Sequence, residues 1–265
     1  MSTSKRKTAD WALILGASSG FGAETARELA KNGLNIYGVH LDRRHAMARI
    51  DGLVTELQGY GVSVIFHNMS ATDPTKRSDV IDELLTEGSV RVKVLLHSLA
   101  FGGLKPVIEK DPAKRLTQKQ IEMTLDVMGS SLVYWAQSLF QAKLLKQGSQ
   151  IFALTSSGGH TQWKTYGAVS AAKAALESYC RQLAFELSEH HIACNAIQAG
   201  VTDTPALRKI PGHERMIEGA LSKNPGKRLT VPGDVAAVIR NLGLAEETWL
   251  TGNVIRVDGG EDITG

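Results

Sequence analysis

Residues 13–22 read LILGASSGFG, and this stretch decides the predicted fold. A short apolar run leads into three glycines with the spacing G-x-x-x-G-x-G, and a helical pattern follows them. Glycine permits a tight turn and a close approach of the backbone to phosphate, and the free N–H groups at a helix start attract an anion. The sequence therefore predicts a strand–turn–helix unit that binds a pyrophosphate. Its predicted cofactor-binding residues are Gly16, Ser18, Ser19, Gly20, Phe21 and Gly22.

Short apolar runs alternate with longer amphipathic stretches along the rest of the chain. The apolar runs, which we expect to be strands, lie at 11–15, 34–39, 62–66, 92–96, 150–154, 192–197 and 253–257. Helical periodicity is found at 23–31, 44–57, 78–85, 118–145, 168–187 and 235–242. This alternation predicts successive βαβ units, a parallel sheet and helices on both of its faces. The expected fold class is α/β with one doubly wound sheet.

The composition is that of a single globular domain. The chain has 265 residues, 43% of them hydrophobic, and a net charge of +3. We expect one domain at 11–265, preceded by a basic tail at 1–10 that contains Lys5, Arg6 and Lys7. The nearly balanced charge gives no reason to expect nucleic acid as a partner.

The remaining compositional signals concern location and redox state. The N-terminus lacks the apolar stretch of a signal peptide, and no run of ~18 apolar residues could span a membrane. We therefore expect a cytoplasmic protein with no membrane partner. The two cysteines, Cys180 and Cys194, fall in a helical and a strand pattern. Both are expected to be small buried residues rather than a disulfide or a metal pair.

The segment at 202–228 is the least regular part of the chain. Its helix breakers are Pro205, Pro211, Gly212, Gly219, Pro225 and Gly226. Breakers at this density predict a loop with one or two short helices, and long excursions of this kind often cover binding sites. We interpret the segment as a substrate lid. The alternative is a surface excursion or an oligomer contact.

The residues after the second predicted strand bear on the choice of nicotinamide cofactor. They read His40-Leu41-Asp42-Arg43-Arg44. A carboxylate here would bind the ribose 2′-hydroxyl of NAD, whereas arginines would grip the 2′-phosphate of NADP. His40 stands where the acid is expected, so we favour NADPH over NADH. The alternative is that Arg43 and Arg44 are solvated residues at a helix start.

Three features together resemble the short-chain dehydrogenase/reductase family. They are the glycine turn, the helix with Tyr166 and Lys173, and the C-terminal stretch VDGG at 257–260. The resemblance extends from about residue 12 to residue 260. It implies a seven-stranded Rossmann-type fold and a homotetramer.

Finer details resemble the bacterial enoyl-acyl-carrier-protein reductases within that family. Tyr166 precedes Lys173 by seven residues, and Val169 occupies the position four before the lysine where the commoner branch has its tyrosine. The stretches HSLAFG at 97–102 and AGVTDT at 199–204 also resemble this group. The glycine turn is of the commoner type, which an NADPH-dependent subgroup of these reductases retains. In contrast, Ser156 stands where many of them carry a second tyrosine, which leaves room for a carbonyl-reducing enzyme.

The resemblance implies a role for several further residues. Tyr166, Lys173 and Ser156 would be catalytic. Cofactor contacts are implied for Asn68, Met69, Ser98, Lys173, Gly200, Thr202 and Thr204, in addition to the glycine turn and the residues at 40–44. Substrate contacts are implied for Phe101, Gly102, Ser156, Tyr166 and Ala206. The alternatives are that Tyr166 is a core or rim residue and Lys173 a surface lysine. His160 and Trp163 fit a pocket wall and a surface loop equally well.

The spacing of tyrosine and lysine has a chemical meaning. On a helix, seven residues separate two side chains by about 10 Å on nearly one face, and four residues by about 6 Å with an offset of ~40°. The expected reaction passes a hydride from NADPH to the β-carbon of a trans-2-enoyl thioester. Tyr166 then donates a hydrogen bond to the thioester oxygen, about two carbons away, while Lys173 holds the ribose.

Three functions are carried forward. The first is an NADPH-dependent enoyl-acyl-carrier-protein reductase of fatty acid synthesis. The second is a carbonyl or alcohol oxidoreductase of the same fold, of the ketoacyl or hydroxysteroid type. The third is a non-catalytic dinucleotide-binding protein. For the first, Arg208, Lys209 and Lys223 are expected to attract the acidic acyl carrier protein.

Overall fold

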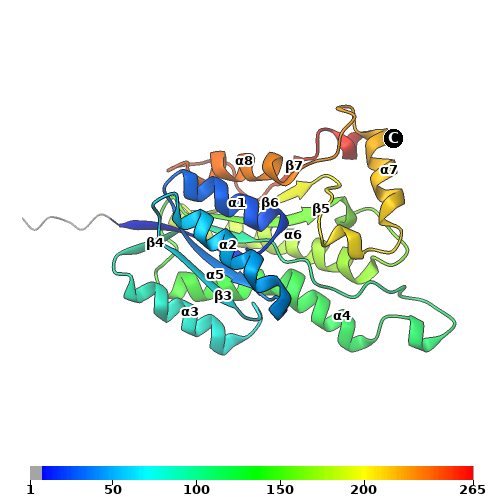
Figure 1. The fold of residues 1–265 in the computed structure, drawn as a ribbon, viewed down its shortest axis with the longest axis horizontal. Helices are drawn as coiled ribbons and strands as arrows, with labels where there is room; N and C mark the ends of the chain where they lie inside the picture. The colour runs from blue at the N-terminus through cyan, green and yellow to red at the C-terminus, as the bar shows by residue number, and fades with distance from the viewer. Residues whose placement is uncertain (1–7, 265) are drawn as a thin grey trace, which may run out of the picture.

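The apolar runs become the strands of one parallel sheet in the computed structural model, which describes residues 8–264 (Figure 1). The 7-stranded sheet has the order β3-β2-β1-β4-β5-β6-β7. Its strands are β1 (Ala9–Leu15), β2 (Asn35–His40), β3 (Val64–Asn68), β4 (Val90–His97), β5 (Gln150–Ser156), β6 (Ala193–Ala199) and β7 (Val254–Val257). The winding reverses between β1 and β4, which opens a crevice at the carboxyl ends of these strands. The predicted seven-stranded Rossmann-type fold is confirmed.

Helices cover both faces of this sheet. They are α1 (Gly20–Lys31), α2 (Met47–Gln58), α3 (Pro74–Thr86), α4 (Gln118–Leu125), α5 (Ser131–Gln141), α6 (Gly167–Leu187), α7 (His213–Lys223) and α8 (Pro232–Gly243). Buried residues of α3, α5 and α6 form one core with Trp11, Leu13 and Leu15. Those of α1, α2 and α8 form the other with Ala12 and Ile14. Alternate residues of β1 thus serve opposite faces, as the period of a strand requires.

The predicted helix at 118–145 is interrupted. A π-helical turn at Asp126–Ser130 separates α4 from α5. The Ser131 hydroxyl donates to the Val127 carbonyl across this turn, at 2.8 Å. A Cβ atom on Gly129 would lie 3.3 Å from the carbonyl oxygen of Ala172, so the wide turn packs closely against α6. Periodicity does not reveal such an insertion, because the apolar face continues through it.

The boundary of the basic tail also differs from the prediction. Ala9 and Asp10 belong to β1, where the Ala9 amide donates to the Ser89 carbonyl at 2.8 Å. Lys5, Arg6 and Lys7 lie outside the described residues. Cys180 and Cys194 are buried and unbridged, as expected. Between residues 8 and 264, no helix combines the length and the apolar character that crossing a membrane would require.

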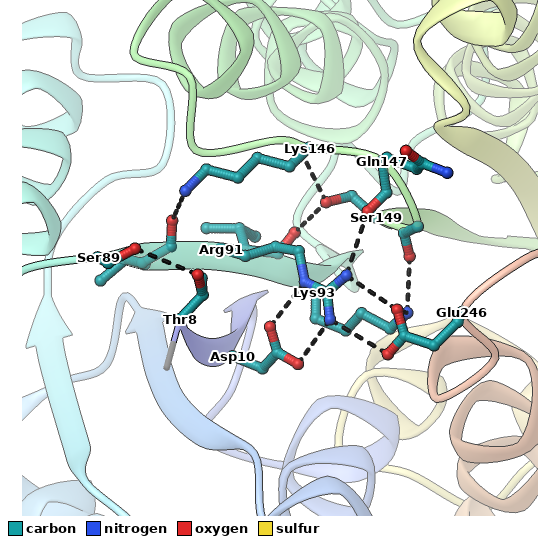
Figure 2. A network of polar contacts seen from close by, with 12 residues as sticks. Thr8, Asp10, Ser89, Arg91, Lys93, Lys146, Gln147, Ser149 and Glu246 are labelled. Atoms are coloured by element: carbon teal, nitrogen blue, oxygen red, sulfur yellow. Dashed lines mark hydrogen bonds and ion pairs between the residues drawn. The ribbon is translucent and has the colours of Figure 1, made fainter. Parts of the chain in front are cut away.

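The buried Lys93 lies at the end of the sheet opposite the crevice, where it is the centre of a polar network (Figure 2). Lys93 is 1% exposed, and its ammonium donates to the carbonyls of Gly148 at 2.9 Å and Ala245 at 2.6 Å. It also lies 3.5 Å from the Glu246 carboxylate. Arg91 joins the same carboxylate to Asp10, with contacts of 3.0 and 2.7 Å. The network therefore links β1, β4 and the segment after α8 by charge-assisted hydrogen bonds.

We predict that Lys93→Met lowers the free energy of unfolding by about 3 kcal/mol, because two buried carbonyls lose their donor. Chemical denaturation measures this change. The matched control is Lys76→Met, which removes an exposed ion pair with Asp79 at 3.2 Å and should cost under about 1 kcal/mol. Equal losses in the two variants would contradict the role given to the buried ammonium.

Candidate functional site

A cleft of about 320 Å³ opens at the carboxyl ends of the strands. Its walls come from the segments after β4, β5 and β6, from the first turns of α6, and from the lid. The sequence-predicted residues that line it are Phe21, Ser98, Phe101, Gly102, Ser156, Tyr166, Lys173, Gly200, Thr202, Thr204 and Ala206. Segments far apart in the sequence thus meet where the winding of the sheet reverses.

Tyr166 stands immediately before α6, as its N-cap residue with φ −103°. It is therefore not inside the helix, but its carbonyl accepts a hydrogen bond from the Ser170 amide at 2.7 Å. The Tyr166 side chain lines the cleft. A Cβ atom on Gly158 would lie 2.5 Å from Cε1 of Tyr166 and 3.1 Å from Oγ of Ser156. Gly158 thus lets the ring approach the serine. The sequence reasoning missed this glycine, which is visible only as one of a Gly-Gly pair.

The hydroxyl groups at this point are poised to donate. Burial raises the pKa of Tyr166. The phenol therefore keeps its proton at neutral pH. The Ser156 Oγ atom is buried without a hydrogen-bond partner among residues 8–264. Such an atom needs a partner from a ligand or from water.

Lys173 lies at the base of the cleft and is 6% exposed. Its ammonium donates to the Leu154 carbonyl at 2.6 Å. Burial lowers the pKa of Lys173 to about 8, and the Glu177 carboxylate opposes that shift. The interpretation of Lys173 as a surface lysine is wrong. Two of its three donors remain for a ligand.

His97 supports the cleft from below without lining it. It is fully buried, and its Nε2 atom lies 2.9 Å from the Ser131 hydroxyl. Burial lowers the pKa of His97 to about 3, and the positive charge of Lys173 contributes a smaller part of this decrease. The ring is therefore neutral, and Lys173 is the cation of this region.

The glycine turn adjoins the cleft. Gly16 has φ +91°, and a Cβ atom there would lie 2.3 Å from the carbonyl oxygen of Ser98. A Cβ atom on Gly22 would lie 2.1 Å from the carbonyl oxygen of Gly16, and one on Gly20 would lie 3.6 Å from Thr204. Gly16 and Gly22 thus permit the close backbone packing that was predicted for the turn, and Gly20 supplies a positive φ of +55° before α1. Ser18 and Ser19 complete the turn, and Ser19 is the N-cap residue of α1.

The residues after β2 are arranged differently from the prediction. His40 is buried, with Nδ1 3.2 Å from the Asp42 carboxylate, and burial lowers the pKa of His40. Asn68 binds the backbone of Asp42, with contacts of 3.0 and 2.9 Å. Arg43 and Arg44 are exposed at this edge. The Asp42 carboxylate is therefore engaged by histidine.

Two further residues refine this end of the site. The side chain of Met69 lies in the core between the sheet and α3, so only its backbone faces the edge. Arg49, on α2, reaches across the edge and donates through Nη1 to the Ser18 carbonyl of the glycine turn. The sequence reasoning missed Arg49. The run RRHAMAR at 43–49, with a third arginine one helical turn further along, was the available signal.

The segment at 202–228, for which the name lid is kept, lines one side of the cleft. It contains α7, and Leu207, Ile210 and Met216 line the cleft with Ala206. Arg208 binds Asp203 through two contacts of 2.7 and 2.8 Å, so its charge is already paired. Lys209 lines the cleft, and Lys223 is exposed at the end of α7.

Of the two residues that could form a pocket wall, Trp163 lines the cleft and His160 does not. Trp163 lines the cleft, and its ring N–H donates to the Pro211 carbonyl of the lid at 3.1 Å. His160 does not line the cleft, because its Nε2 atom lies 3.1 Å from the carboxylate of Asp262 near the C-terminus.

Comparison with known proteins shows which family this sequence matches. A family model described as enoyl-(acyl carrier protein) reductase matches residues 16–261. The 3-oxoacyl-[acyl-carrier-protein] reductase of Thermotoga maritima is 26% identical over 249 residues, or 94% of this chain and 96% of that protein. The 1-cyclohexenylcarbonyl-CoA reductase of Streptomyces collinus is 25% identical over 253 residues, or 95% and 86% of the two chains.

Solved structures share the fold over nearly their full length. An enoyl-[acyl-carrier-protein] reductase (NADH) from Aquifex aeolicus superposes with a TM-score of 0.82 at 22% identity, covering 97% of this chain and 98% of that one. A short chain dehydrogenase from Burkholderia cenocepacia in complex with NADP has a TM-score of 0.80 at 23% identity, covering 97% and 100%. At these identities the likeness is one of fold.

We predict that the ¹³Cε resonance of Lys173 titrates with a pKa of about 8. Because the Glu177 carboxylate favours the ammonium form, Glu177→Gln should lower this pKa further. Glu186→Gln, an exposed change on the same helix, should leave it unaltered. NMR titration of selectively labelled lysine decides the matter, and an ordinary lysine pKa of about 10.4 in the unmodified protein would contradict the burial argument.

Proposed function

This chain belongs to the short-chain dehydrogenase/reductase family, and on that premise we propose that it is an NADPH-dependent enoyl-thioester reductase. The family makes it an oxidoreductase. The choice of a carbon–carbon double bond as the group reduced is our inference. The observation that carries it is the pair of residues at the start of α6 that face the cleft, Tyr166 and Val169.

The positions of these two residues separate the two possible reductions. Val169 is 3% exposed, and its alkyl side chain stands in the cleft four residues before Lys173. Reduction of a ketone requires a proton donor at the carbon that accepts hydride. Reduction of an enoyl thioester requires one at the carbonyl oxygen, about two carbons away. The phenol of Tyr166, one turn further out, suits the second geometry.

The residues of the cleft fit a dinucleotide and the reaction. The glycine turn, where a side chain on Gly16 or Gly22 would collide with backbone, leads directly into α1, and the start of that helix suits a pyrophosphate. NADPH, when bound, supplies the hydride. The Tyr166 phenol, which burial keeps protonated, donates to the oxyanion that develops on the thioester. The two remaining donors of Lys173 would hold a ribose hydroxyl of the cofactor.

The preference for NADPH rests on three arginines at the end of β2. Asp42, the carboxylate that would bind a ribose 2′-hydroxyl, is engaged by His40. Arg43 and Arg44 are exposed beside it, and Arg49 approaches the glycine turn from α2. A guanidinium binds phosphate through parallel hydrogen bonds, so this edge favours a 2′-phosphate.

A second candidate is a ketoacyl reductase. It is favoured by the unpartnered Ser156 hydroxyl beside Tyr166, which could bind a ketone oxygen. The relative from Thermotoga maritima, named a 3-oxoacyl-[acyl-carrier-protein] reductase, points the same way. The name of the Streptomyces collinus relative instead specifies a cyclohexenylcarbonyl thioester. The substrate test below distinguishes the two reactions.

We predict that the protein oxidises NADPH with crotonyl thioester and not with acetoacetyl thioester, as followed by NADPH absorbance. Tyr166→Phe should reduce turnover on the order of 10²-fold and leave the Kd of NADPH unchanged, because only the transition state loses a donor. Tyr179→Phe, further along α6, is the matched control. Oxidation with the ketone alone would establish the second candidate and refute the first.

For the cofactor, we predict that Arg49→Ala raises the Kd of NADPH about tenfold, which is the loss of one charge-assisted contact. The Kd of NADH should change little, because NADH lacks the 2′-phosphate. Fluorescence titration measures both constants, with Arg181→Ala, an exposed change on α6, as the control. An equal increase in the Kd of both cofactors would mean that Arg49 only holds the glycine turn through the Ser18 carbonyl and does not contact the 2′-phosphate.

The substrate is proposed to arrive on an acyl carrier protein, which is acidic. Because Arg208 is paired with Asp203, the attracting charges are Lys209 at the cleft and Lys223 at the end of α7. We predict that Lys209→Glu with Lys223→Glu raises KM several-fold more for the carrier-bound substrate than for a coenzyme A thioester. Equal effects on both substrates would exclude carrier docking here. The homotetramer and the cytoplasmic location stay predictions.

A further inference from the structure

The last residues of the chain form a tight turn beside the lid. After β7, Gly259 and Gly260 adopt φ +63° and +87° and bend the chain back into a short 3-10 turn at Glu261–Ile263. Asp258 is buried, and its carboxylate accepts the amides of Gly260 at 2.9 Å and Asp262 at 3.0 Å. We call residues 258–264 the C-terminal turn. Figure 1 shows the C-terminal end next to α7.

The C-terminal turn holds the residue before the lid. The Glu261 carboxylate accepts the amide of Val201, with oxygen distances of 3.1 and 3.3 Å. Val201 lines the cleft. The C-terminal turn packs closely against this residue's neighbour. A Cβ atom on Gly200 would lie 3.0 Å from a Glu261 oxygen and 3.1 Å from Cα of Asp258.

The same turn also holds the far end of the lid. The side-chain amide of Asn224 donates through Nδ2 to the backbone carbonyl of Asp258 at 2.8 Å. The Thr264 hydroxyl donates to the carbonyl of Lys223, the last residue of α7, at 3.0 Å. One short segment therefore contacts residues on both sides of the stretch that lines the cleft.

A third contact reaches the loop between Ser156 and Tyr166. The Asp262 carboxylate lies 3.1 Å from Nε2 of His160 and 3.2 Å from Nε of Arg256. The Asp262 side chain is 9% exposed, whereas His160 and Arg256 reach it from the surface with side chains that are 47% and 50% exposed. Movement of the C-terminal turn would therefore disturb this loop together with the lid.

We propose that the C-terminal turn is a clasp for the cleft, with Glu261 and Asp262 as positioning residues. Glu261 fixes the lid through Val201, and Asp262 fixes the loop before Tyr166 through His160. Without Glu261, the lid loses its anchor at one hinge and samples open positions, so substrate binding weakens while the reacting groups keep their places. Without Asp262, the loop between Ser156 and Tyr166 loses its support, so the two hydroxyl groups are held less firmly and turnover decreases. These kinetic roles rest on the proposed function, whereas the mechanical role does not.

Limited trypsin digestion of the full chain tests the mechanical role. The lid contains six cleavable residues, Arg208, Lys209, Arg215, Lys223, Lys227 and Arg228. We expect Glu261→Ala to speed cleavage in the lid at least about fivefold, with cleavage at Lys110 and Lys114 in the loop after β4 unchanged. Glu261→Gln, which keeps an acceptor for Val201, should give an intermediate rate. Glu247→Ala, an exposed change between α8 and β7, should behave like the unmodified protein.

The kinetic role requires a split between the two variants. Glu261→Ala should raise KM for the thioester at least about threefold with kcat within twofold, and Asp262→Asn should lower kcat at least about threefold. Cleavage that accelerates equally at Lys110 and in the lid, or no acceleration at all, would overturn the clasp. If lid cleavage accelerates but no thioester is reduced by the unmodified protein, the clasp stands and only the proposed function fails.

Discussion

The hydrogen bond from the Lys173 ammonium to the Leu154 carbonyl fixes the geometry of the whole cleft. It is 2.6 Å long and joins α6 to β5 at the carboxyl edge of the sheet. Because the ammonium is buried, any shift of α6 along the sheet would leave a charge and a carbonyl unpaired at high cost. The register of α6 is thus set, and with it the places of Val169 and Tyr166. The proposed choice between two reductions follows from that register.

Missing side chains shape the cleft as much as the side chains that line it. Gly16 lets the first turn meet the Ser98 carbonyl, and Gly158 lets the Tyr166 ring reach Ser156. At Gly102, a Cβ atom would lie 2.6 Å from Thr124 and 3.0 Å from Val169. Replacing one of these glycines would force apart the backbone at Gly16, the ring at Gly158 or the packed side chains at Gly102. The cleft is therefore a result of close packing, which explains why its parts come from separate βα units.

Local patterns predicted the sheet, most helices and the residues around the cleft, because strand and helix periods are written in neighbouring residues. They could not show pairs that are distant in the sequence. Arg49 binds Ser18 across 31 positions, and Glu261 binds Val201 across 60. The π-helical turn at Asp126–Ser130 was equally hidden, because it packs at Gly129 against α6, which is distant in the sequence. The pairing of Arg208 with Asp203 removed a charge that the sequence alone left free.

Burial acts on the two proposed catalytic groups in opposite directions. It raises the pKa of Tyr166 and lowers that of Lys173 to about 8, so both groups are shifted toward their neutral forms. A phenol that keeps its proton is a reliable hydrogen-bond donor, and a buried ammonium is a strong one. Such donors would serve the reduction of a ketone and of an enoyl thioester alike. The acidities therefore do not distinguish the two substrates, and the distinction depends on where the phenol stands relative to the alkyl side chain of Val169.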